Sequence, residues 1–491
     1  MKRRLAALML VLWRKGECLL KRWLAALMLV LCLLALAFTG CSGTKMKSPT
    51  GLMRPPLSAG VDSELKSAFL SAATGKGKAA SASEISLISP LSGDHRSAFV
   101  LHDIDNDGVN EALVFYKLES EPSKEHMNVL DNVNGKWVSV NDFSGTGTGV
   151  NFVSFVQMTE TGCPAILVSQ SLYENDASKI LSVYVCTGNE EKLTVKNVCT
   201  EVYSVMENVD VDSDGLLDIF LIQQDLTNNN SLRSTAKVFK MNASGTLDEF
   251  GTAKLDGGIS KYCSIQTDKV NPSSPLRIYV DAIKGEDQAI TEVLFWSASS
   301  KSLVTPMFSL DTQSNMFTAR SELLASQDYD GDGIIEIPSQ RPLMGSRKYE
   351  SPKNMYEQMN VTSWIEVRSS KDFEFTETLV NASDSYILDF KPLENIMGEF
   401  TVYSYSNTRT WIFKEYSAKY ETAGDDLFAI ICTTKDSANQ KGVKSENYLI
   451  ENDDGTVVYF ESREKGAKAG ITVKSIKPYI KIFKDKELAA K

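Results

Sequence analysis

Short apolar stretches, either continuous or alternating with polar residues, recur along most of this chain and are separated by turns rich in Gly, Asn, Asp and Ser. Two such stretches flank the dipeptide Asn134-Gly135, which is a strong signal for a β-hairpin. The pattern predicts a mainly β protein built from antiparallel strands. Similar paired stretches predict further hairpins at residues 180–198, 236–245, 290–308 and 363–379.

A helical period replaces this pattern near the start of the chain. Leu65, Phe69 and Ala73 recur every four residues, which places them on one face of a helix. Asp62 or Ser63 can cap its N-terminus. The preceding residues are rich in Pro, Ser and Gly, so we expect residues 41–82 to form a tether and one short helix.

The first 40 residues predict a targeting segment. Seven Lys or Arg and a single acid precede an apolar run at residues 24–38. This run is shorter than the roughly 20 residues of a membrane-spanning helix, which favours a signal peptide over residues 1–40. An uncleaved anchor is the alternative, and both place the rest of the chain outside the cytoplasmic membrane.

The apolar run ends in Phe38-Thr39-Gly40-Cys41. This sequence resembles the lipobox of bacterial lipoproteins, in which the cysteine becomes the first mature residue and carries lipid, palmitate included. The resemblance implies that Cys41 anchors the protein to the extracytoplasmic face of the cell membrane.

An acidic motif, D-x-D-x-D-G-x-x-[DE], occurs three times: loop 1 (residues 103–111), loop 2 (210–218) and loop 3 (328–336). Carboxylates at positions 1, 3 and 5 can surround one cation, and the glycine at position 6 permits the sharp turn. The carbonyl at position 7 and the acid at position 9 complete an oxygen shell that suits calcium better than magnesium. Apolar β-branched residues follow, so we expect a strand rather than the helix of an EF-hand. A surface acidic turn without metal is the alternative.

The motif recurs after 107 and 118 residues, and degenerate copies lie between. One copy at residues 157–168 keeps Gly162 but lacks the acids, and a looser copy lies near Gln266. Each copy precedes a predicted hairpin, so the repeating unit is strand, loop, strand and hairpin. Four strands in about 50–60 residues predict a β-propeller blade, with five recognisable repeats and up to seven blades.

The units resemble the FG-GAP and VCBS repeats of integrin-type β-propellers, which carry this calcium loop between the first two strands of a blade. The resemblance covers residues 96–380 in five units and implies about three calcium ions. It implies that the ligands are Asp103, Asp105, Asp107, Val109, Glu111, Asp210, Asp212, Asp214, Leu216, Asp218, Asp328, Asp330, Asp332, Ile334 and Glu336. We further expect residues 85–88 to supply a strand to the last blade and close the ring.

The repeat stops near residue 384. Short strand signals continue, and residues 452–455 predict one more hairpin turn. Residues 468–483 fit either a short helix or a final strand. We therefore expect a signal peptide (1–40), a tether with a helix (41–82), a calcium-binding propeller (83–384) and a small α+β domain (385–491).

Composition limits the function. A net charge of −11 argues against nucleic-acid binding, which needs clustered Lys and Arg. Only three histidines are present, and no catalytic motif is recognised, so no catalytic residue is assigned. Cys186 and Cys199 could form a disulfide, although buried thiols are the favoured interpretation.

These features favour a lipid-anchored, non-enzymatic module that binds an extracellular glycan or protein. Tyr173, Trp296 and Trp364 are candidates for stacking on a ligand, although aromatic residues in blades more often belong to the core. The alternatives are a polysaccharide-active enzyme and a scaffold for envelope assembly.

Overall fold

The computed structural model describes residues 62–75, 81–145, 147–172, 178–189, 192–225, 233–346, 349–350 and 355–484. The chain divides into two units, Met1–Gly60 and Val61–Lys491, and all described residues belong to the second. The predicted signal peptide, Cys41 and most of the tether lie outside the described residues. Within the described ranges, no helix combines the length and the apolar content needed to cross a membrane.

The predicted helix is α3 (Ser63–Gly75), and it packs on the first sheet. Leu65 and Phe69 are buried against Tyr116 of that sheet, which confirms the predicted apolar face. A one-turn 3-10 helix, η1 (Ala82–Glu84), leads into the strands. These are β1 (Ile85–Leu87), β2 (Phe99–His102), β3 (Glu111–Leu118), β4 (Glu121–Val133) and β5 (Lys136–Ser144).

The expected role of residues 85–88 is wrong. Strand β1 pairs antiparallel with β3 of its own sheet, with Ile85 opposite Leu118, and supplies no strand to the last unit. Strand β2 pairs with the other half of β3, with Phe99 opposite Val114. The two short strands share one edge of β3 because each is too short to cover it alone.

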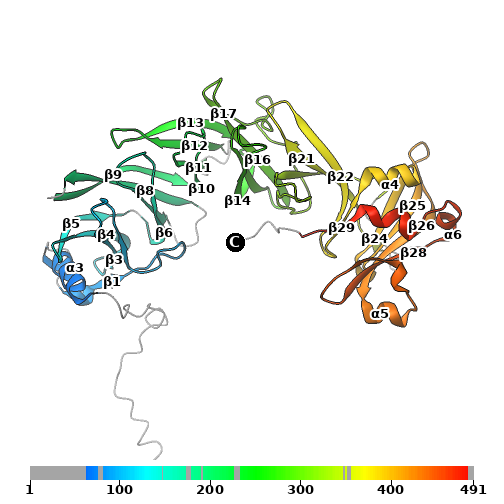
Figure 1. The fold of residues 1–491 in the computed structure, drawn as a ribbon, viewed down its shortest axis with the longest axis horizontal. Coiled ribbons are helices and arrows are strands. Elements are labelled where there is room, and N and C mark those ends of the chain that lie inside the picture. Colours follow the sequence, from blue (N-terminus) through cyan, green and yellow to red (C-terminus); the bar gives the residue numbers. More distant parts are fainter. Residues whose placement is uncertain are drawn as a thin grey trace, which may run out of the picture. The chain divides into compact units, whose positions relative to one another are not determined.

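Three four-stranded antiparallel sheets follow, each with its strands in chain order (Figure 1). This arrangement confirms the predicted unit of strand, loop, strand and hairpin. The second sheet contains β6 (Gly149–Val156), β7 (Ala165–Ser171), β8 (Lys179–Asn189) and β9 (Lys192–Tyr203). The third contains β10 (Val205–Val209), β11 (Asp218–Asp225), β12 (Arg233–Met241) and β13 (Leu247–Leu255). The fourth contains β14 (Ile259–Asp268), β15 (Arg277–Lys284), β16 (Gln288–Ser297) and β17 (Ser302–Val304).

The fifth sheet has the order β18, β21, β22, β23, β29 and crosses the boundary expected at residue 384. Its last strand comes from the end of the described chain, where β29 pairs with β23. One hydrophobic cluster extends from Leu343 to Ile480, so this sheet and the C-terminal region share a core. The strands are β18 (Glu336–Pro342), β21 (Asn360–Val367), β22 (Phe373–Asn381), β23 (Tyr386–Asp389) and β29 (Ile480–Ile482).

A sixth sheet in the C-terminal region has the order β24, β25, β26, β28, β27. The hairpin predicted at residues 452–455 joins β27 to β28. Its strands are β24 (Phe400–Tyr405), β25 (Thr410–Ser417), β26 (Thr422–Thr434), β27 (Tyr448–Glu451) and β28 (Thr456–Ser462). The remaining elements are β19 (Tyr349–Glu350), β20 (Met355–Tyr356), α4 (Phe390–Met397), α5 (Lys435–Gln440), α6 (Glu464–Lys468), α7 (Val473–Ile476), η2 (Ser406–Thr408), η3 (Ser445–Asn447) and η4 (Lys477–Tyr479).

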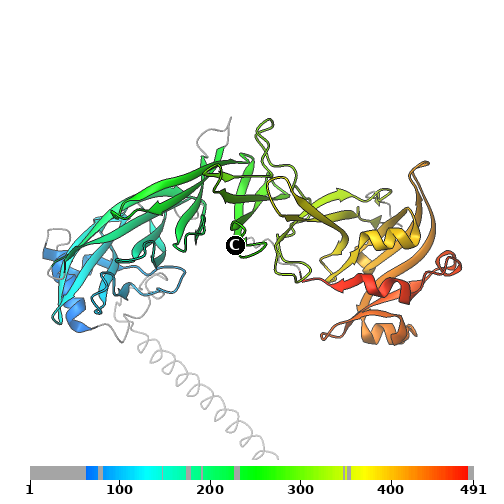
Figure 2. The same ribbon diagram turned by 45° about the horizontal axis from the view of Figure 1, so that its top comes forward.

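The sheets follow one another in chain order (Figure 2), and neighbouring sheets share apolar cores. Phe115 of the first sheet and Ile166 of the second belong to one buried cluster. Phe220 of the third and Val280 of the fourth belong to another. Each sheet therefore buries both of its faces, which explains the nearly continuous apolar runs in strands such as β3 and β11.

Candidate functional site

The three acidic loops occupy equivalent places in their sheets. In each loop the acid at position 9 is the first residue of the strand that follows: Glu111 in β3, Asp218 in β11 and Glu336 in β18. The loops therefore lead into strands, as predicted, and not into helices.

Backbone conformation is also repeated. Position 6 is a glycine with positive φ in every loop, at 87° for Gly108 and 91° for both Gly215 and Gly333. Position 4 adopts the left-handed conformation too, with φ of 62° at Asn106 and Ser213. An L residue with a large side chain is strained at such angles, so this turn selects Gly, Asn or Ser.

The acid at position 1 organises each turn by accepting hydrogen bonds from two backbone N–H groups. In loop 1 the N–H of Asp107 donates to Asp103 Oδ1 at 3.2 Å, and that of Gly108 donates to Asp103 Oδ2 at 3.0 Å. The corresponding bonds are both 3.0 Å in loop 2, and 3.0 and 2.9 Å in loop 3. The acids are thus held by the turn itself.

Carboxylates converge in all three loops. In each, ligand atoms from three acids lie within 4.8 Å of one another: Asp103, Asp105 and Glu111; Asp210, Asp212 and Asp218; Asp328, Asp330 and Asp332. These trios leave out the predicted ligands Asp107, Asp214 and Glu336. At position 7, the backbone N–H group donates a hydrogen bond to the acid at position 5. The distances are 2.7 Å for Val109, 2.9 Å for Leu216 and 2.8 Å for Ile334.

The buried carboxylate of loop 1 favours a bound cation. Glu111 is 1% exposed, and its Oε2 accepts a hydrogen bond of 2.9 Å from the Ile104 N–H. Its Oε1 is buried and has no hydrogen-bond partner among the described residues. Burial raises the pKa of Glu111 to about 8. A divalent cation beside the Glu111 carboxylate would compensate its burial, which otherwise favours the neutral form.

Loop 2 contains a residue that the sequence analysis missed. Lys240 of β12 places its Nζ 2.7 Å from Asp212 Oδ2, 2.6 Å from Asp214 Oδ2 and 3.9 Å from Asp218 Oδ1. Loop 2 therefore already contains a positive charge. The motif is local in sequence and gives no sign of this lysine, which only the pairing of β11 with β12 brings to the loop.

Hydrogen bonds connect the loops to neighbouring sheets. Asn106 Nδ2 donates to the carbonyl of Gly162, in the degenerate copy, at 2.7 Å. Lys269 Nζ donates to Ser213 Oγ at 3.1 Å, and the Ile335 N–H donates to Asp268 Oδ2 at 2.7 Å. The degenerate copies therefore serve as contact surfaces for the acidic loops.

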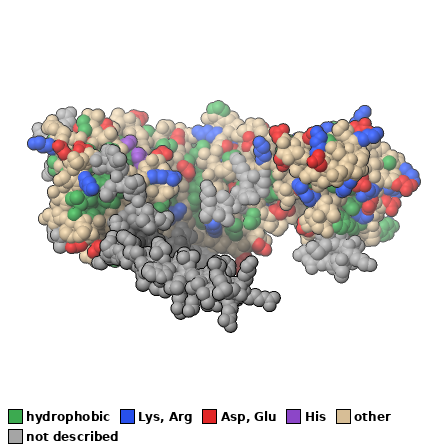
Figure 3. Space-filling model, turned by 90° about the horizontal axis from the view of Figure 1, so that it is seen from below, with side chains coloured by type: hydrophobic (Ala, Val, Ile, Leu, Met, Phe, Trp, Pro, Cys, Tyr) green, Lys and Arg blue, Asp and Glu red, His purple; other side chains and the backbone are tan. Residues whose placement is uncertain are grey.

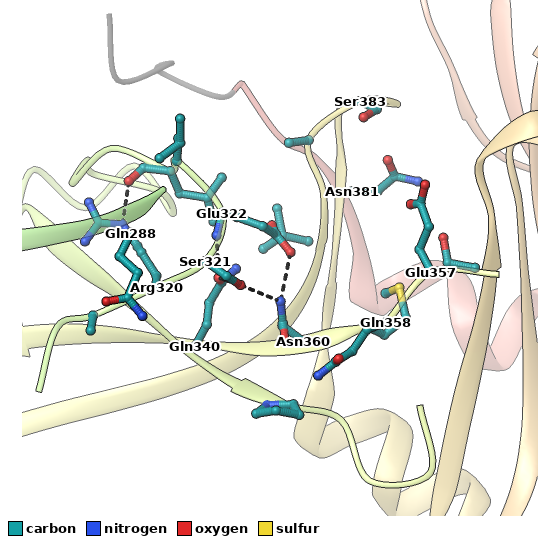
Figure 4. A pocket seen from close by; sticks show the side chains of 18 of the residues that line it. Gln288, Arg320, Ser321, Glu322, Gln340, Glu357, Gln358, Asn360, Asn381 and Ser383 are labelled. Atoms are coloured by element: carbon teal, nitrogen blue, oxygen red, sulfur yellow. Dashed lines mark hydrogen bonds between the residues drawn. The ribbon is translucent and has the colours of Figure 1, made fainter. Parts of the chain in front are cut away.

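A separate polar cavity of about 1000 Å³ lies near the fifth sheet (Figure 4). Asn360 Nδ2 donates to Ser321 Oγ and to Glu322 Oε1, both at 3.3 Å, and Trp411 contributes an aromatic surface. Many of the lining side chains are amides or hydroxyls, which can donate and accept hydrogen bonds. The cavity is suited to a neutral polar ligand.

The two aromatic candidates within the described residues, Trp296 and Trp364, both stack on other aromatic side chains. Trp364 is 1% exposed and stacks on Tyr329, while Trp296 is half-buried and stacks on Phe250. Tyr173 lies outside the described residues. Trp364 is therefore a core residue, as is usual for aromatic side chains in blades.

Surface charge and cysteines give no further site. Acidic and basic side chains are interspersed on the face shown in Figure 3. Cys186 and Cys199 are free thiols, so the suggested disulfide is absent and the favoured interpretation of separate thiols stands. Burial raises the pKa of Cys199 to about 11, which keeps it protonated near neutral pH.

The fold and loops define a mainly β protein with repeated acidic turns. No known family profile and no curated protein matches the chain. A hypothetical selenium-binding protein from Sulfolobus tokodaii is 11% identical with a TM-score of 0.23, over 43% of this chain and 54% of that protein. The chain thus spans about half the length of that protein. A periplasmic gluconolactonase from Pseudomonas aeruginosa is 11% identical with a TM-score of 0.22, over 62% and 91%. Similarities this weak carry no argument about fold or function.

Proposed function

We propose that this chain is a calcium-stabilised binding module of the β-propeller type, similar in its repeats to FG-GAP and VCBS proteins. The observation that carries the proposal is the repeated geometry of the three loops, which brings acids together on a shared backbone frame. Four mutually repelling carboxylates in one turn are unfavourable without a cation, so their repetition supports a bound ion.

Calcium is the ion that the donor set fits best. All the converging ligand atoms are carboxylate oxygens, and hard cations prefer such ligands. A loop of this kind can supply a variable number of oxygen ligands. This suits the variable coordination number of calcium and not the strict octahedron of magnesium.

Binding is the role that a rigid, repeated β structure suits. The polar cavity near the fifth sheet is the candidate ligand site, and its amides and Trp411 suit a glycan or a polar peptide segment. The resemblance of residues 38–41 to a lipobox supports an anchor through Cys41 on the extracytoplasmic face of the cell membrane. At such a location, weak turn sites with dissociation constants of about 0.1–1 mM, as in extracellular calcium modules, would suffice.

Thermal melting tests the proposal. The full chain is melted in calcium, in magnesium and in chelator. We expect calcium to raise the melting temperature because it binds only the folded loops. The rise should exceed that in magnesium, whose strict octahedron the loops fit less well. The variant Glu111→Gln removes a buried charged ligand of loop 1 and should reduce the calcium shift. Glu119→Gln, at an exposed turn, is the matched control and should leave the shift intact. Equal melting temperatures in calcium and chelator would refute the proposal.

A further inference from the structure

The strand that begins with the acid at position 9 pairs with β4 in the first sheet, β12 in the third and β21 in the fifth. Each of these partner strands brings one more side chain to the acidic loop, and this residue differs among the loops. In the first sheet Ala112 pairs with Leu130, in the third Ile219 pairs with Phe239, and in the fifth Ile337 pairs with Ile365. The first members of these pairs directly follow the acid at position 9. The next residues on the partner strands are therefore equivalent: Asp131, Lys240 and Glu366.

Lys240 occupies the acidic cluster of loop 2. Its Nζ bridges Asp212 and Asp214 at 2.7 and 2.6 Å, and it lies 5.1 Å from the centre of the Phe250 ring. Asp218 is fully buried, and its Oδ1 lies 3.9 Å from the same ammonium. The lysine is thus held on several sides at the place where a cation would meet these acids.

Loop 1 has the opposite arrangement. Asp131 adds a fifth carboxylate to the electrostatic surroundings of Glu111, together with those of Asp105 and Asp107. The Oε1 atom of Glu111 and the equivalent Oδ1 atom of Asp218 in loop 2 are both buried without a hydrogen-bond partner within the described part of the chain, but Asp218 Oδ1 faces the Lys240 ammonium at 3.9 Å. Loop 1 therefore has more negative charge than loop 2 and no ammonium ion-paired with its acids among the described residues.

In loop 3 the equivalent acid is engaged elsewhere. Glu366 forms a two-pronged ion pair with Arg368, at 3.0 and 3.3 Å. The acids Asp328, Asp330 and Asp332 are exposed and keep their convergence. Loop 3 therefore resembles loop 1 in lacking a lysine at this register position.

We propose that Lys240 replaces the metal in loop 2, so that loops 1 and 3 bind calcium and loop 2 is closed by its own ammonium group. This inference rests on the proposed function, because it concerns which of the acidic loops take the ion. It assigns the choice to one register position on the partner strand (β4, β12 or β21), which is acidic where metal binds and basic where it does not.

The physical reason is competition for the same oxygens. An ammonium at 2.6–2.7 Å already forms charge-assisted hydrogen bonds with two of the predicted ligands. Calcium would have to displace the lysine from Asp212 and Asp214, and the nearby ammonium group would still repel the ion at close range. Neither cost arises in loop 1, where the equivalent residue attracts the ion.

Metal counting tests the inference. The full chain is loaded with calcium chloride, and bound ions are counted by native mass spectrometry and by calorimetric titration. We expect two ions in the unmodified protein, three in Lys240→Asp and one in Asp131→Lys. Lys237→Asp is the matched control, since Lys237 lies on the same strand, is equally exposed and forms its ion pairs with Glu201 and Glu249, so the count should stay at two.

The outcomes separate the two proposals. Three ions in the unmodified protein would overturn the role of Lys240 and leave the calcium proposal standing. An unchanged count of two in Lys240→Asp, with a folded circular dichroism spectrum, would also overturn it. No bound ion in any variant would overturn the calcium proposal and this inference together.

Discussion

At the scale of single residues, burial of acids decides how this protein responds to pH. Glu292 is fully buried, where its Oε1 accepts a hydrogen bond of 2.7 Å from the Asp256 N–H and its Oε2 accepts one of 3.2 Å from Asn315. Burial raises the pKa of Glu292 from an ordinary value of 4.5 to about 7. The folded state therefore holds this proton more tightly than the unfolded state does.

The sign of the pH dependence follows. Stability from Glu292 is fully present below pH 4.5 and is lost as the pH rises through about 7. At about 1.4 kcal/mol per pKa unit, the free energy of unfolding should fall by up to about 3 kcal/mol across this range. Urea unfolding in chelator at pH 5 and pH 8 measures the change, and Glu292→Gln should flatten it. An equal slope in the variant would show that other groups carry the dependence.

Individual residues also show which features could be predicted from the sequence and which could not. The acidic turns could be predicted because every residue that shapes them lies within nine consecutive positions, Gly108 among them. Lys240 could not, because its role depends on the register between β11 and β12 and not on the motif. Trp364 could be assigned to the core only by the packing of Tyr329 on its ring.

At the scale of elements, a buried ion pair connects β15 to the segment that follows β17. Arg320 Nη2 lies 3.2 Å from Asp281 Oδ1, and both side chains are fully buried. Arg320 Nη1 also donates to Thr291 Oγ1 at 3.0 Å, and Ser326 donates to Asp281. The pair therefore belongs to a satisfied network, and removing one member leaves a buried charge uncompensated.

We expect Arg320→Met to lower the free energy of unfolding by about 3–5 kcal/mol. The control is Arg341→Met, whose ion pair with Glu377 at 2.8 Å is partly exposed and should contribute less than about 1 kcal/mol. The midpoints of urea unfolding give both values. Similar losses in the two variants would contradict the assigned importance of burial.

A glycine allows the short helix α6 to pack closely against β26. A Cβ atom at Gly466 would lie 1.9 Å from the carbonyl oxygen of Leu427, so Gly466→Ala must move the helix away from the strand. We expect a loss of about 3 kcal/mol, typical of severe overpacking. Gly149→Ala is the control, because no atom lies within 4 Å of its Cβ position. Unchanged melting of Gly466→Ala would show that α6 is loosely attached.

At the scale of the whole molecule, consecutive sheets are coupled through their shared cores and through the loops. The Asn106 side chain reaches Gly162 of the next unit, and Asp268 reaches the backbone of loop 3. We therefore expect an ion bound in one loop to stabilise two neighbouring sheets. The repeated sheets could be predicted from the hairpin signals, whereas the positions of β1 and β29 could not, because short strands select their partners through tertiary packing.

Hydrogen exchange in calcium and in chelator measures this coupling. We expect chelation to reduce protection in loop 1 and also at residues 157–163, which contact it. Loop 2 should change little if Lys240 supplies its cation, and β25, in a sheet without an acidic loop, is the internal control. A uniform loss of protection in every sheet would contradict local coupling.

The pairing of β29 with β23 has a consequence for biosynthesis. Ile480–Ile482 emerges from the ribosome long after Tyr386–Asp389, so the edge of β23 stays unsatisfied until residue 482 has been released. A nascent or prematurely terminated chain would offer that edge to other polypeptides, as unpaired strands do. Premature stop codons shortly before residue 480 should therefore yield aggregating products rather than slightly shortened functional ones.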